Sequence, residues 1–341
     1  MRRDLLELME AALRQIEVTS PPLQWDRTLL LNNTGSLKAR VRGEPPVSTD
    51  RGFHLLLLSE AGEPEYYCKC RPRNPDGSDR RAARFLRRFQ KDPDTRSIVP
   101  RQGHAHNRRI DVQVAGFVRA PRMDKVLEGL DERAFHELVK NVQSAALRLS
   151  RTALRVKGSS AQQVDLVQES DPLLRDLPQL GVATEVGNLL RRGLAQVGDV
   201  PPFPQHRDLW PNNVFAHEDG GCTIVDFDDF GVVRVPLHDA FHLLRTSTAG
   251  AGRMESRLWF EHLQVGDTIV AEIIRDAGRE LGLTTRQVGG CLLYYFLDIA
   301  VATFRRGGPE TFWGQFRDEL PAVAAFLSQH RDISALGELV S

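Results

Sequence analysis

Cysteine is scarce in this 341-residue sequence, which has four cysteines and no CxxC pair. This scarcity argues against a disulfide-stapled scaffold and against a zinc ribbon, because both depend on closely spaced cysteine pairs. We predict that Cys68, Cys70, Cys222 and Cys291 are buried thiols in a reducing compartment. With 41% hydrophobic and 26% charged residues, the composition is that of an ordinary folded protein.

Long apolar runs are also absent. The most apolar run, residues 291–304, contains Asp298 and is shorter than the ~20 residues that a membrane helix needs. Residues 2–17 begin with two arginines, as a signal peptide would, but acidic residues interrupt any apolar core. The spacing of the apolar residues predicts an amphipathic helix there. We therefore expect a soluble, cytoplasmic protein without a membrane segment.

The sequence has no net charge, but its two parts differ. Residues 1–120 carry 22 Lys and Arg against 15 Asp and Glu, and the remainder carries 23 against 30. Most of the basic surplus lies between Lys69 and Arg109, which suits either phosphate binding or a solvated basic helix. Nucleic-acid binding would need interleaved aromatic platforms and a recognised module, and neither is present. Nucleic acid is therefore an unlikely partner.

The length predicts two cores. Short runs rich in β-favouring residues, separated by Gly, Pro, Asn and Asp, predict an antiparallel sheet with a helix packed on it at 79–89. The predicted strand runs are residues 28–31, 37–41, 53–58, 66–70 and 110–118. The pattern then changes to helical periodicity near residue 118.

Helices are predicted at 131–149 with Asp131 as cap, at 183–196, at 267–281 with Asp267 as cap, and at 285–305. We expect an α+β protein with two lobes. Residues 1–117 form a small antiparallel β lobe with one or two helices, and residues 118–341 form a larger, mainly helical lobe.

The segment HRDLWPNN, residues 206–213, places His206, Asp208 and Asn213 in one short loop. Phosphoryl transfer from a nucleotide needs a carboxylate to orient the acceptor hydroxyl and oxygen ligands for magnesium. Asp208 is the candidate base, and His206 is predicted to support the loop. Asn213 and Asp226, which follows the β-favouring residues 223–225, offer oxygens suited to a hard cation.

These motifs resemble the catalytic core of the protein-kinase-like fold. Within that fold, HRDLWPNN and IVDFDD, with the following PLHDAFHLL, are most similar to the aminoglycoside phosphotransferase and choline kinase family, which phosphorylates small molecules. The resemblance implies ATP or GTP as donor and Mg²⁺ as cofactor. It further implies Asp208 as the base, Asn213 and Asp226 as metal ligands, and Asp239 as a buried acid that steadies the catalytic loop. The acids at 208, 226, 228 and 229 could instead form a solvated acidic cluster, but a magnesium site is favoured, with Asp228 as a further ligand.

The resemblance also implies a strand lysine that binds nucleotide phosphates, for which Lys69 is the candidate. Strand alternation places Tyr67, Lys69 and Arg71 on one face and Cys68 and Cys70 on the other. The alternative for Lys69 is an ordinary exposed strand lysine.

Two features depart from the family pattern. The helix predicted at 79–89 has no glutamate to pair with Lys69, so Asp79 or another acid must replace it. A GxGxxG loop is absent, and Ser48 and Thr49 are the candidates for contacting the phosphates.

Alternative functions are a protein serine/threonine kinase and a pseudokinase that acts as a nucleotide-responsive binding module. Arg207 completes the HRD spelling of protein kinases, where small-molecule kinases usually have glycine. However, Trp210 replaces the lysine of protein kinases. His238 and His242 have a spacing that zinc could use, yet a structural role is favoured because HExxH is absent. His104 and His106 are left without an assigned role.

The acceptor is the least determined part of the prediction. An aminoglycoside, a sugar and an amino alcohol all fit a small-molecule kinase, and the first would imply antibiotic resistance. The acidic surplus after residue 120 favours a cationic acceptor.

Overall fold

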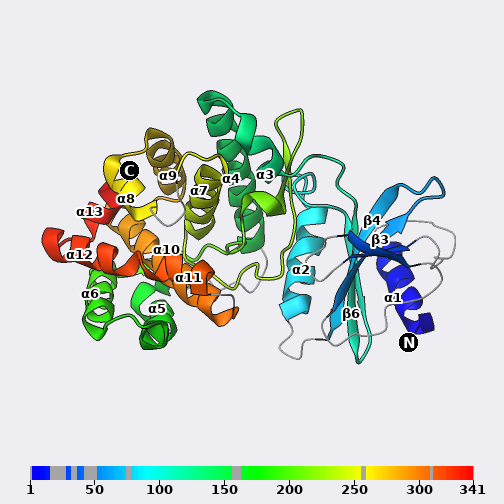
Figure 1. Ribbon diagram of the computed structural model, residues 1–341, viewed down its shortest axis with the longest axis horizontal. Coiled ribbons are helices and arrows are strands. Elements are labelled where there is room, and N and C mark those ends of the chain that lie inside the picture. The colour runs from blue at the N-terminus through cyan, green and yellow to red at the C-terminus, as the bar shows by residue number, and fades with distance from the viewer. Residues whose placement is uncertain are drawn as a thin grey trace. The chain divides into compact units, whose positions relative to one another are not determined.

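The computed structural model describes residues 2–15, 28–31, 37–41, 52–73, 78–155, 163–254, 259–307 and 310–340 (Figure 1). The helices and strands in chain order are α1 (Arg2–Arg14), β1 (Thr28–Leu31), β2 (Leu37–Val41), β3 (Phe53–Leu58), β4 (Pro64–Pro72), α2 (Ser78–Lys91), β5 (Gln102–His106), β6 (Ile110–Gly116), α3 (Met123–Val126), η2 (Leu127–Gly129), α4 (Glu132–Leu154), β7 (Val164–Asp165), α5 (Leu166–Asp176), η3 (Leu177–Leu180), α6 (Thr184–Ala195), β8 (Asp199–Val200), η4 (Pro211–Asn213), β9 (Val214–Ala216), β10 (Cys222–Ile224), α7 (His238–Gly250), α8 (Trp259–Val265), α9 (Thr268–Glu280), α10 (Thr285–Arg305), α11 (Glu310–Arg317), α12 (Leu320–His330) and α13 (Ser334–Glu338).

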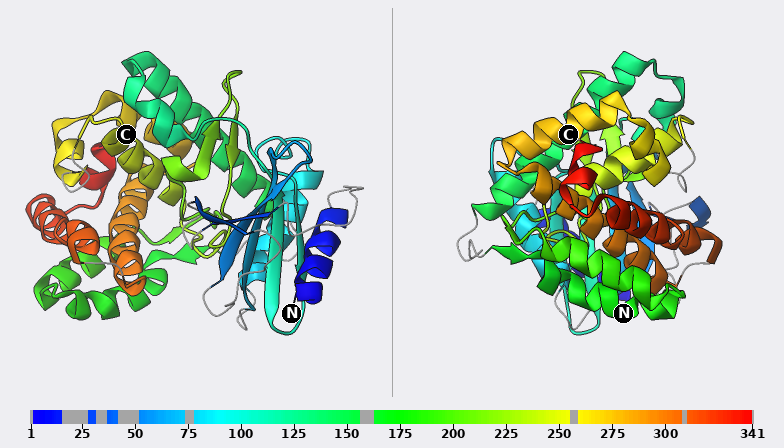
Figure 2. Two further views of the ribbon diagram at one scale, coloured as in Figure 1. Left: turned by 45° about the vertical axis from the view of Figure 1, so that its right-hand side comes forward. Right: turned by 90° about the vertical axis from the view of Figure 1, so that its left-hand side faces the viewer.

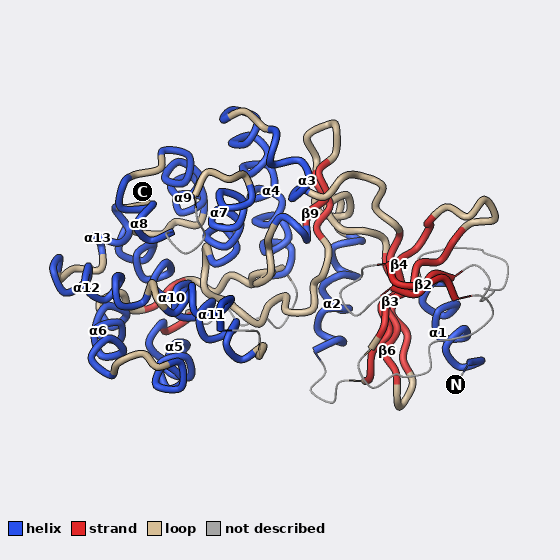
Figure 3. Tube along the Cα trace, viewed as in Figure 1, coloured by secondary structure: helices blue, strands red, loops and turns tan. Residues whose placement is uncertain are grey.

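The chain divides into two compact units. Unit 1 comprises Met1–Ala120 and Thr223–Asp228, and unit 2 comprises Pro121–Cys222 and Asp229–Ser341. The sequence prediction placed a single break near residue 118 and did not anticipate that a short later segment belongs to the first unit. The α+β class is confirmed, with a small antiparallel sheet in unit 1 and mostly helices in unit 2 (Figure 3).

The sheet of unit 1 has six strands in the order β2-β1-β3-β4-β6-β5. Its neighbouring strands pair antiparallel, as predicted. The register places Lys69 of β4 opposite His54 of β3 and opposite Gln113 of β6. The segment around His104 and His106, for which the sequence left strand and loop open, is strand β5.

Helix α1 covers one face of this sheet (Figures 1 and 2). Its apolar residues share a core with Leu55, Cys68, Cys70, Val112 and Val114. A Cβ on Gly103 of β5 would lie 1.8 Å from the carbonyl oxygen of Ala12, so only glycine allows α1 to lie this close to the strand. The predicted helix at 2–17 is confirmed up to Arg14, and residues 16 and 17 lie outside the described residues.

Helix α2 lies on the opposite face, with Ala83, Leu86 and Phe89 buried. The segment Thr223–Asp228 packs beside α2 and the turn that follows it. The Ile224 N–H donates to the carbonyl oxygen of Ile98, in that turn, at 2.7 Å. The ring of Phe227 also lies 5.8 Å from that of Phe89, centroid to centroid. These contacts explain why the segment belongs to unit 1.

Helix α10 is the centre of unit 2 and packs against α5, α6, α7, α11, α12 and α13 (Figure 2). It starts with a capping box between Thr284 and Gln287. Among the described residues, α10 is long and apolar enough to cross a membrane, yet 83% of its apolar stretch is buried inside the protein. Burial on all sides is typical of the central helix of a core.

The predicted helices of unit 2 are confirmed, including α6, α9 and α10 within one or two residues of their expected ends. The Asp131 carboxylate accepts a bond from the Ala134 N–H at the start of α4. Asp267 caps α9 in the same way.

Candidate active site

Lys69 lies at the centre of a charged cluster on the sheet face opposite α1. Its Nζ is 3.0 Å from Asp226 Oδ1 and 2.5 Å from Asp228 Oδ2. Arg71, two residues along the same strand, donates from Nη1 and Nη2 to the two oxygens of Asp228 at 2.7 and 2.9 Å. We refer to Lys69, Arg71, Asp226 and Asp228 as the lysine cluster; it lies entirely within unit 1.

The lysine cluster contains two cations and two carboxylates. The cations stabilise the ionised carboxylates, and the carboxylates stabilise the protonated lysine. Burial works against the charge of Lys69, but Asp226 and Asp228 outweigh it and hold the pKa of Lys69 above its ordinary value. Burial likewise raises the pKa of Asp228, and Lys69 and Arg71 reverse this effect and place it far below the ordinary value. The sequence did not determine which acid pairs with Lys69. In the structure the acids that contact it are Asp226 and Asp228, from the segment Thr223–Asp228.

Asp226 has a left-handed backbone with φ of 63°. Aspartate tolerates this conformation better than most residues, because its short polar side chain can bond locally. Its side chain is 43% exposed, so solvent reaches this carboxylate while Lys69 contacts it.

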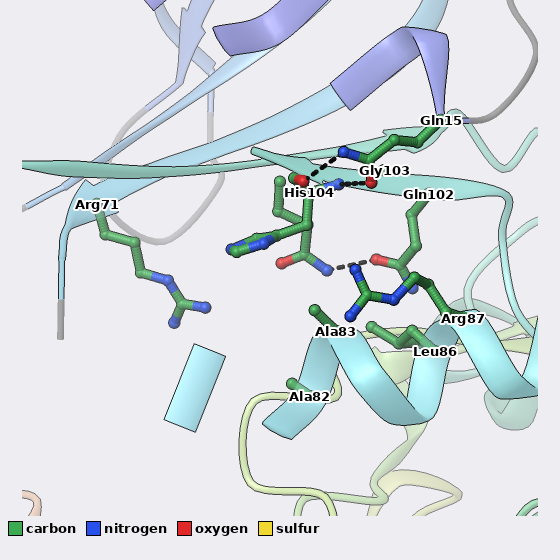
Figure 4. Close-up of a pocket in the computed structure, with 10 residues that line it drawn as sticks. Gln15, Arg71, Ala82, Ala83, Leu86, Arg87, Gln102, Gly103 and His104 are labelled. Carbon is green, nitrogen blue, oxygen red and sulfur yellow. Dashed lines mark hydrogen bonds between the residues drawn. The ribbon is translucent and has the colours of Figure 1, made fainter. Parts of the chain in front are cut away.

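A separate small cavity lies beside the cluster, at the β5 edge of the sheet (Figure 4). Arg71 lines it together with Ala82, Ala83, Leu86 and Arg87 of α2. Gln15 closes it by bonding the backbone of His104 through both its amide nitrogen and its carbonyl oxygen (Figure 4). Of the lysine cluster, Arg71 lines this cavity, whereas Lys69, Asp226 and Asp228 do not.

The predicted catalytic loop lies in unit 2, where the Asp239 carboxylate anchors its backbone. The N–H groups of His206 and Arg207 donate to Asp239 at 2.6 and 2.7 Å. In return, the Asp239 N–H donates to the side-chain oxygen of Gln205 at 2.9 Å. His206 and Asp239 are both buried, so solvent does not compete for these bonds.

Arg207 has a left-handed backbone, with φ of 72°. Glycine adopts this conformation without strain, which is a physical reason for the glycine that the sequence resemblance implied at this position. The guanidinium of Arg207 is held by Asp298 of α10, with Nη2 3.1 Å from Oδ1. His238 Nε2 lies 3.0 Å from the other oxygen of Asp298. Burial raises the pKa of Asp298, but His238 and Arg207 together lower it to about 2.

Asp208 is held by two side chains. The amide nitrogen of Asn213 donates to Asp208 Oδ2 at 3.0 Å and to the Asp208 carbonyl oxygen at 2.9 Å. Arg306, directly after α10, donates from Nη1 to Asp208 Oδ1 at 3.2 Å and from Nη2 to Asp229 Oδ2 at 3.3 Å. We refer to Asp208, Asn213, Asp229 and Arg306 as the Asp208 cluster; it lies within unit 2.

The charges around Asp208 keep it ionised. Burial raises its pKa, but Arg306, His242 and His206 outweigh burial, so the pKa lies below its ordinary value. The two bonds to Asp208 also orient the Asn213 side chain. Its amide nitrogen is used as a donor to Asp208, so its side-chain oxygen is the atom that can accept a bond or bind a cation.

The remaining predicted residues have different outcomes. Ser48 and Thr49 lie outside the described residues. His238 pairs with Asp298, and no group of three or more His, Cys, Asp and Glu side chains among the described residues is arranged to hold a metal. His104 lies 3.2 Å from Asp111, so it has a structural partner.

Sequence reasoning gave no site role to two charged residues of unit 2: Arg306, which bonds Asp208, and Asp298, which bonds Arg207. Asp298 carried a signal, because a single acid in an otherwise apolar helix requires a buried partner. Nothing in the sequence placed Arg306 near Asp208, 98 residues away.

The model of the phosphotransferase enzyme family matches residues 71–272, which is more than half of the chain and includes the whole 206–239 region but not Lys69. No curated protein matches the sequence.

Solved structures of similar fold include three aminoglycoside phosphotransferases. A type VIII aminoglycoside-3'-phosphotransferase has 17% identity and a TM-score of 0.49, over 85% of this chain and 98% of its own. The ADP-bound APH(2'')-Ib has 13% identity and a TM-score of 0.47, over 92% and 95%. APH(3'')-Id from Streptomyces rimosus has 17% identity and a TM-score of 0.41, over 74% and 91%.

Proposed function

Because the chain belongs to the phosphotransferase enzyme family, we propose that it transfers the γ-phosphate of ATP or GTP to a hydroxyl group of a small molecule, with Asp208 as the general base. The observation that carries the proposal is the state of Asp208. Its carboxylate lies within residues 71–272, which match the family. Neighbouring charges hold its pKa below the ordinary value, and bonds from Asn213 and Arg306 fix its position.

Phosphoryl transfer asks the protein mainly for positioning, because the transition state involves little covalent help from side chains. The acceptor oxygen forms a bond to the γ-phosphorus while the bond from that phosphorus to the nucleoside diphosphate breaks. The hydroxyl proton passes to Asp208, which a depressed pKa keeps ready to accept a hydrogen bond from the alcohol. Asp239 fixes the backbone that carries Asp208 and is a positioning residue, as is His206.

Two of the predicted metal ligands, each taken within its own unit, offer an oxygen that suits magnesium. Asp226 offers a partly exposed carboxylate, and Asn213 offers a carboxamide oxygen whose amide nitrogen is already committed. Both are hard oxygen ligands, and Mg²⁺ usually takes only one or two protein carboxylates and completes its shell with water and phosphate. Asp228 fits less well, because both of its oxygens accept bonds from Arg71. When bound, the metal would neutralise charge on the nucleotide phosphates.

Lys69 and Arg71 are the cations that would contact the nucleotide phosphates from unit 1. Neighbouring carboxylates keep Lys69 protonated, and its side chain is only 17% exposed, which favours an oriented ammonium over a solvated one. Ser48 and Thr49 stay predictions for the same role.

The test is replacement of Asp208 by asparagine, which preserves size and removes the charge. We expect turnover to fall by roughly 100-fold or more, while stabilisation by Mg-nucleotide is kept. Asp171→Asn is the matched control, because Asp171 lies on the surface of the same unit and pairs with Arg191. Purified protein would be incubated with Mg-ATP and a panel of aminoglycosides, sugars and amino alcohols and examined by mass for phosphate adducts. Wild-type turnover in Asp208→Asn would remove Asp208 as the base.

A further inference from the structure

Arg306 forms an ion pair with Asp208, the carboxylate that the proposed function assigns as the base. We propose that Arg306 selects an acceptor that carries an oxyanion, a carboxylate or a phosphate, close to the hydroxyl that is phosphorylated. This inference rests on the proposed function and narrows its acceptor to acidic alcohols, against the cationic acceptor that the overall charge of the sequence had favoured.

The first step concerns the acids near Asp208. An acceptor with several ammonium groups needs carboxylates that are available to receive them. Asp208 and its cluster partner Asp229 are both already bonded to Arg306. An ammonium group would have to displace this guanidinium to reach either acid, so these two carboxylates do not favour ammonium ligands.

The second step concerns the exposure of Arg306. Its side chain is 51% exposed, whereas that of Arg207 is 18% exposed. A guanidinium has five N–H donors, and the two bonds of Arg306 use one hydrogen on each of its terminal nitrogens. Arg306 therefore presents donors to solvent directly beside the base, in the planar fork that matches carboxylates and phosphates.

The third step concerns the strength of the present bonds. At 3.2 and 3.3 Å they lie at the long end for charged hydrogen bonds, which are typically nearer 2.8 Å. Each of the two guanidinium nitrogens serves a different carboxylate, so neither pair is bidentate. An incoming oxyanion that engages both nitrogens at once would compete well for Arg306.

The consequence for the reaction follows from this exchange. When Arg306 moves its bond from Asp208 to an oxyanion of the acceptor, Asp208 Oδ1 becomes available to the acceptor hydroxyl. Asn213 continues to hold the other oxygen, so the carboxylate keeps its orientation. An acceptor that lacks the oxyanion leaves Arg306 on the base and competes with it for the same oxygen. The exchange of Arg306 between Asp208 and the acceptor therefore selects acceptors that carry an oxyanion.

The experiment compares acceptors that share one carbon skeleton and differ in charge. Glycerate, glycerol 3-phosphate, glycerol and 3-amino-1,2-propanediol form one set, and gluconate, glucose and glucosamine form a second; kanamycin represents polycations. Acceptor-dependent formation of nucleoside diphosphate and mass detection of adducts give kcat and KM for each. We expect the acidic member of a set to exceed the neutral one by about tenfold or more in kcat/KM, with the ammonium member lowest.

The variants test whether Arg306 causes that preference. Arg306→Gln should reduce the acid-to-neutral ratio by roughly tenfold or more, mainly through KM of the acidic acceptor, and Arg306→Lys should retain part of it. Arg305→Gln is the matched control, since Arg305 is the preceding residue and pairs with Asp176 instead of Asp208; the ratio should not change.

Each outcome separates the inference from the proposed function. Adducts on neutral or ammonium acceptors in preference to acids would overturn the inference alone. An equal fall in kcat for all acceptors in Arg306→Gln would also overturn it, because it would assign Arg306 to the transferred phosphoryl group. No adduct with any acceptor would count against the proposed function, and the inference would fall with it. Glycerate and glycerol 3-phosphate, which share one skeleton, distinguish carboxylate from phosphate as the recognised oxyanion.

Discussion

Replacing Asp298 with asparagine should destabilise unit 2 by an amount that can be worked out from its pKa. The carboxylate is buried on α10 and pairs with Arg207 and His238. Its pKa falls from the ordinary 3.8 to about 2. Each pKa unit corresponds to about 1.4 kcal/mol, so the ionised carboxylate stabilises the folded state by about 2 kcal/mol at neutral pH. Asparagine keeps the volume but leaves the Arg207 cation without its partner.

The pH dependence has a defined sign. The folded-state pKa of Asp298 is depressed, so its contribution is present above the ordinary value of 3.8 and is lost as pH falls through about 2. The pKa of His238 is raised despite burial, because Asp239 and Asp298 favour its charged form. Its contribution is present below the ordinary 6.5 and is lost as pH rises through the folded value. The difference between wild type and variant should therefore be largest between about pH 4 and 6.5.

Urea denaturation at several pH values measures this difference, with tryptophan fluorescence as the probe, since three of the four tryptophans, Trp210, Trp259 and Trp313, lie in unit 2. The control is Asp171→Asn, whose exposed pair with Arg191 should change stability by less than about 1 kcal/mol. A midpoint for Asp298→Asn that matches wild type at pH 6, or a deficit that persists unchanged near pH 2, would refute the reasoning.

Three further predictions concern the proposed chemistry. Asp226→Asn should weaken the thermal stabilisation that Mg-nucleotide provides, and an unchanged shift would contradict its role as a metal ligand. Lys69→Met should raise KM for the nucleotide at least severalfold with little effect on KM of the acceptor; an effect confined to the acceptor would oppose the assignment. Arg306→Gln should move the acidic limb of the kcat/KM profile to higher pH, because Arg306 helps to depress the pKa of Asp208. Superimposable profiles would show that another charge sets that limb.

Much of the fold could be predicted because its signals are local. The apolar period of α9 and α10, and the aspartate caps at 131 and 267, each depend on residues within one or two turns. Strand alternation likewise placed Lys69 and Arg71 opposite Cys68 and Cys70, as the structure has them. Strand β5 could not be separated from a loop by sequence, because QGHAH has no β-branched residue and contains a glycine.

The contacts of the candidate site likewise divide into local ones, which the sequence predicts, and long-range ones, which it does not. Asp208 and Asn213 are five residues apart, so one loop motif predicts that they are neighbours. The pairing of Lys69 with Asp226 spans 157 residues and depends on Thr223–Asp228 packing against α2, which no local pattern encodes. Only the family resemblance suggested that these residues act together. Arg306 follows a helix end, where a basic residue is favourable for the helix dipole alone, so its contact with Asp208 had no separate signal.

The burial of Cys68 and Cys70 beneath α1 makes the pair a natural reporter of motion. Their sulfur atoms lie 3.5 Å apart, and a thiol reagent can reach them only when α1 detaches from the sheet. In a chain with Cys222 and Cys291 replaced by alanine, the rate of thiol modification would measure how often this helix opens. The opposite face of the same strand carries Lys69 and Arg71, so slower labelling in the presence of nucleotide would reveal a ligand on one side of β4 through the protection of its other side.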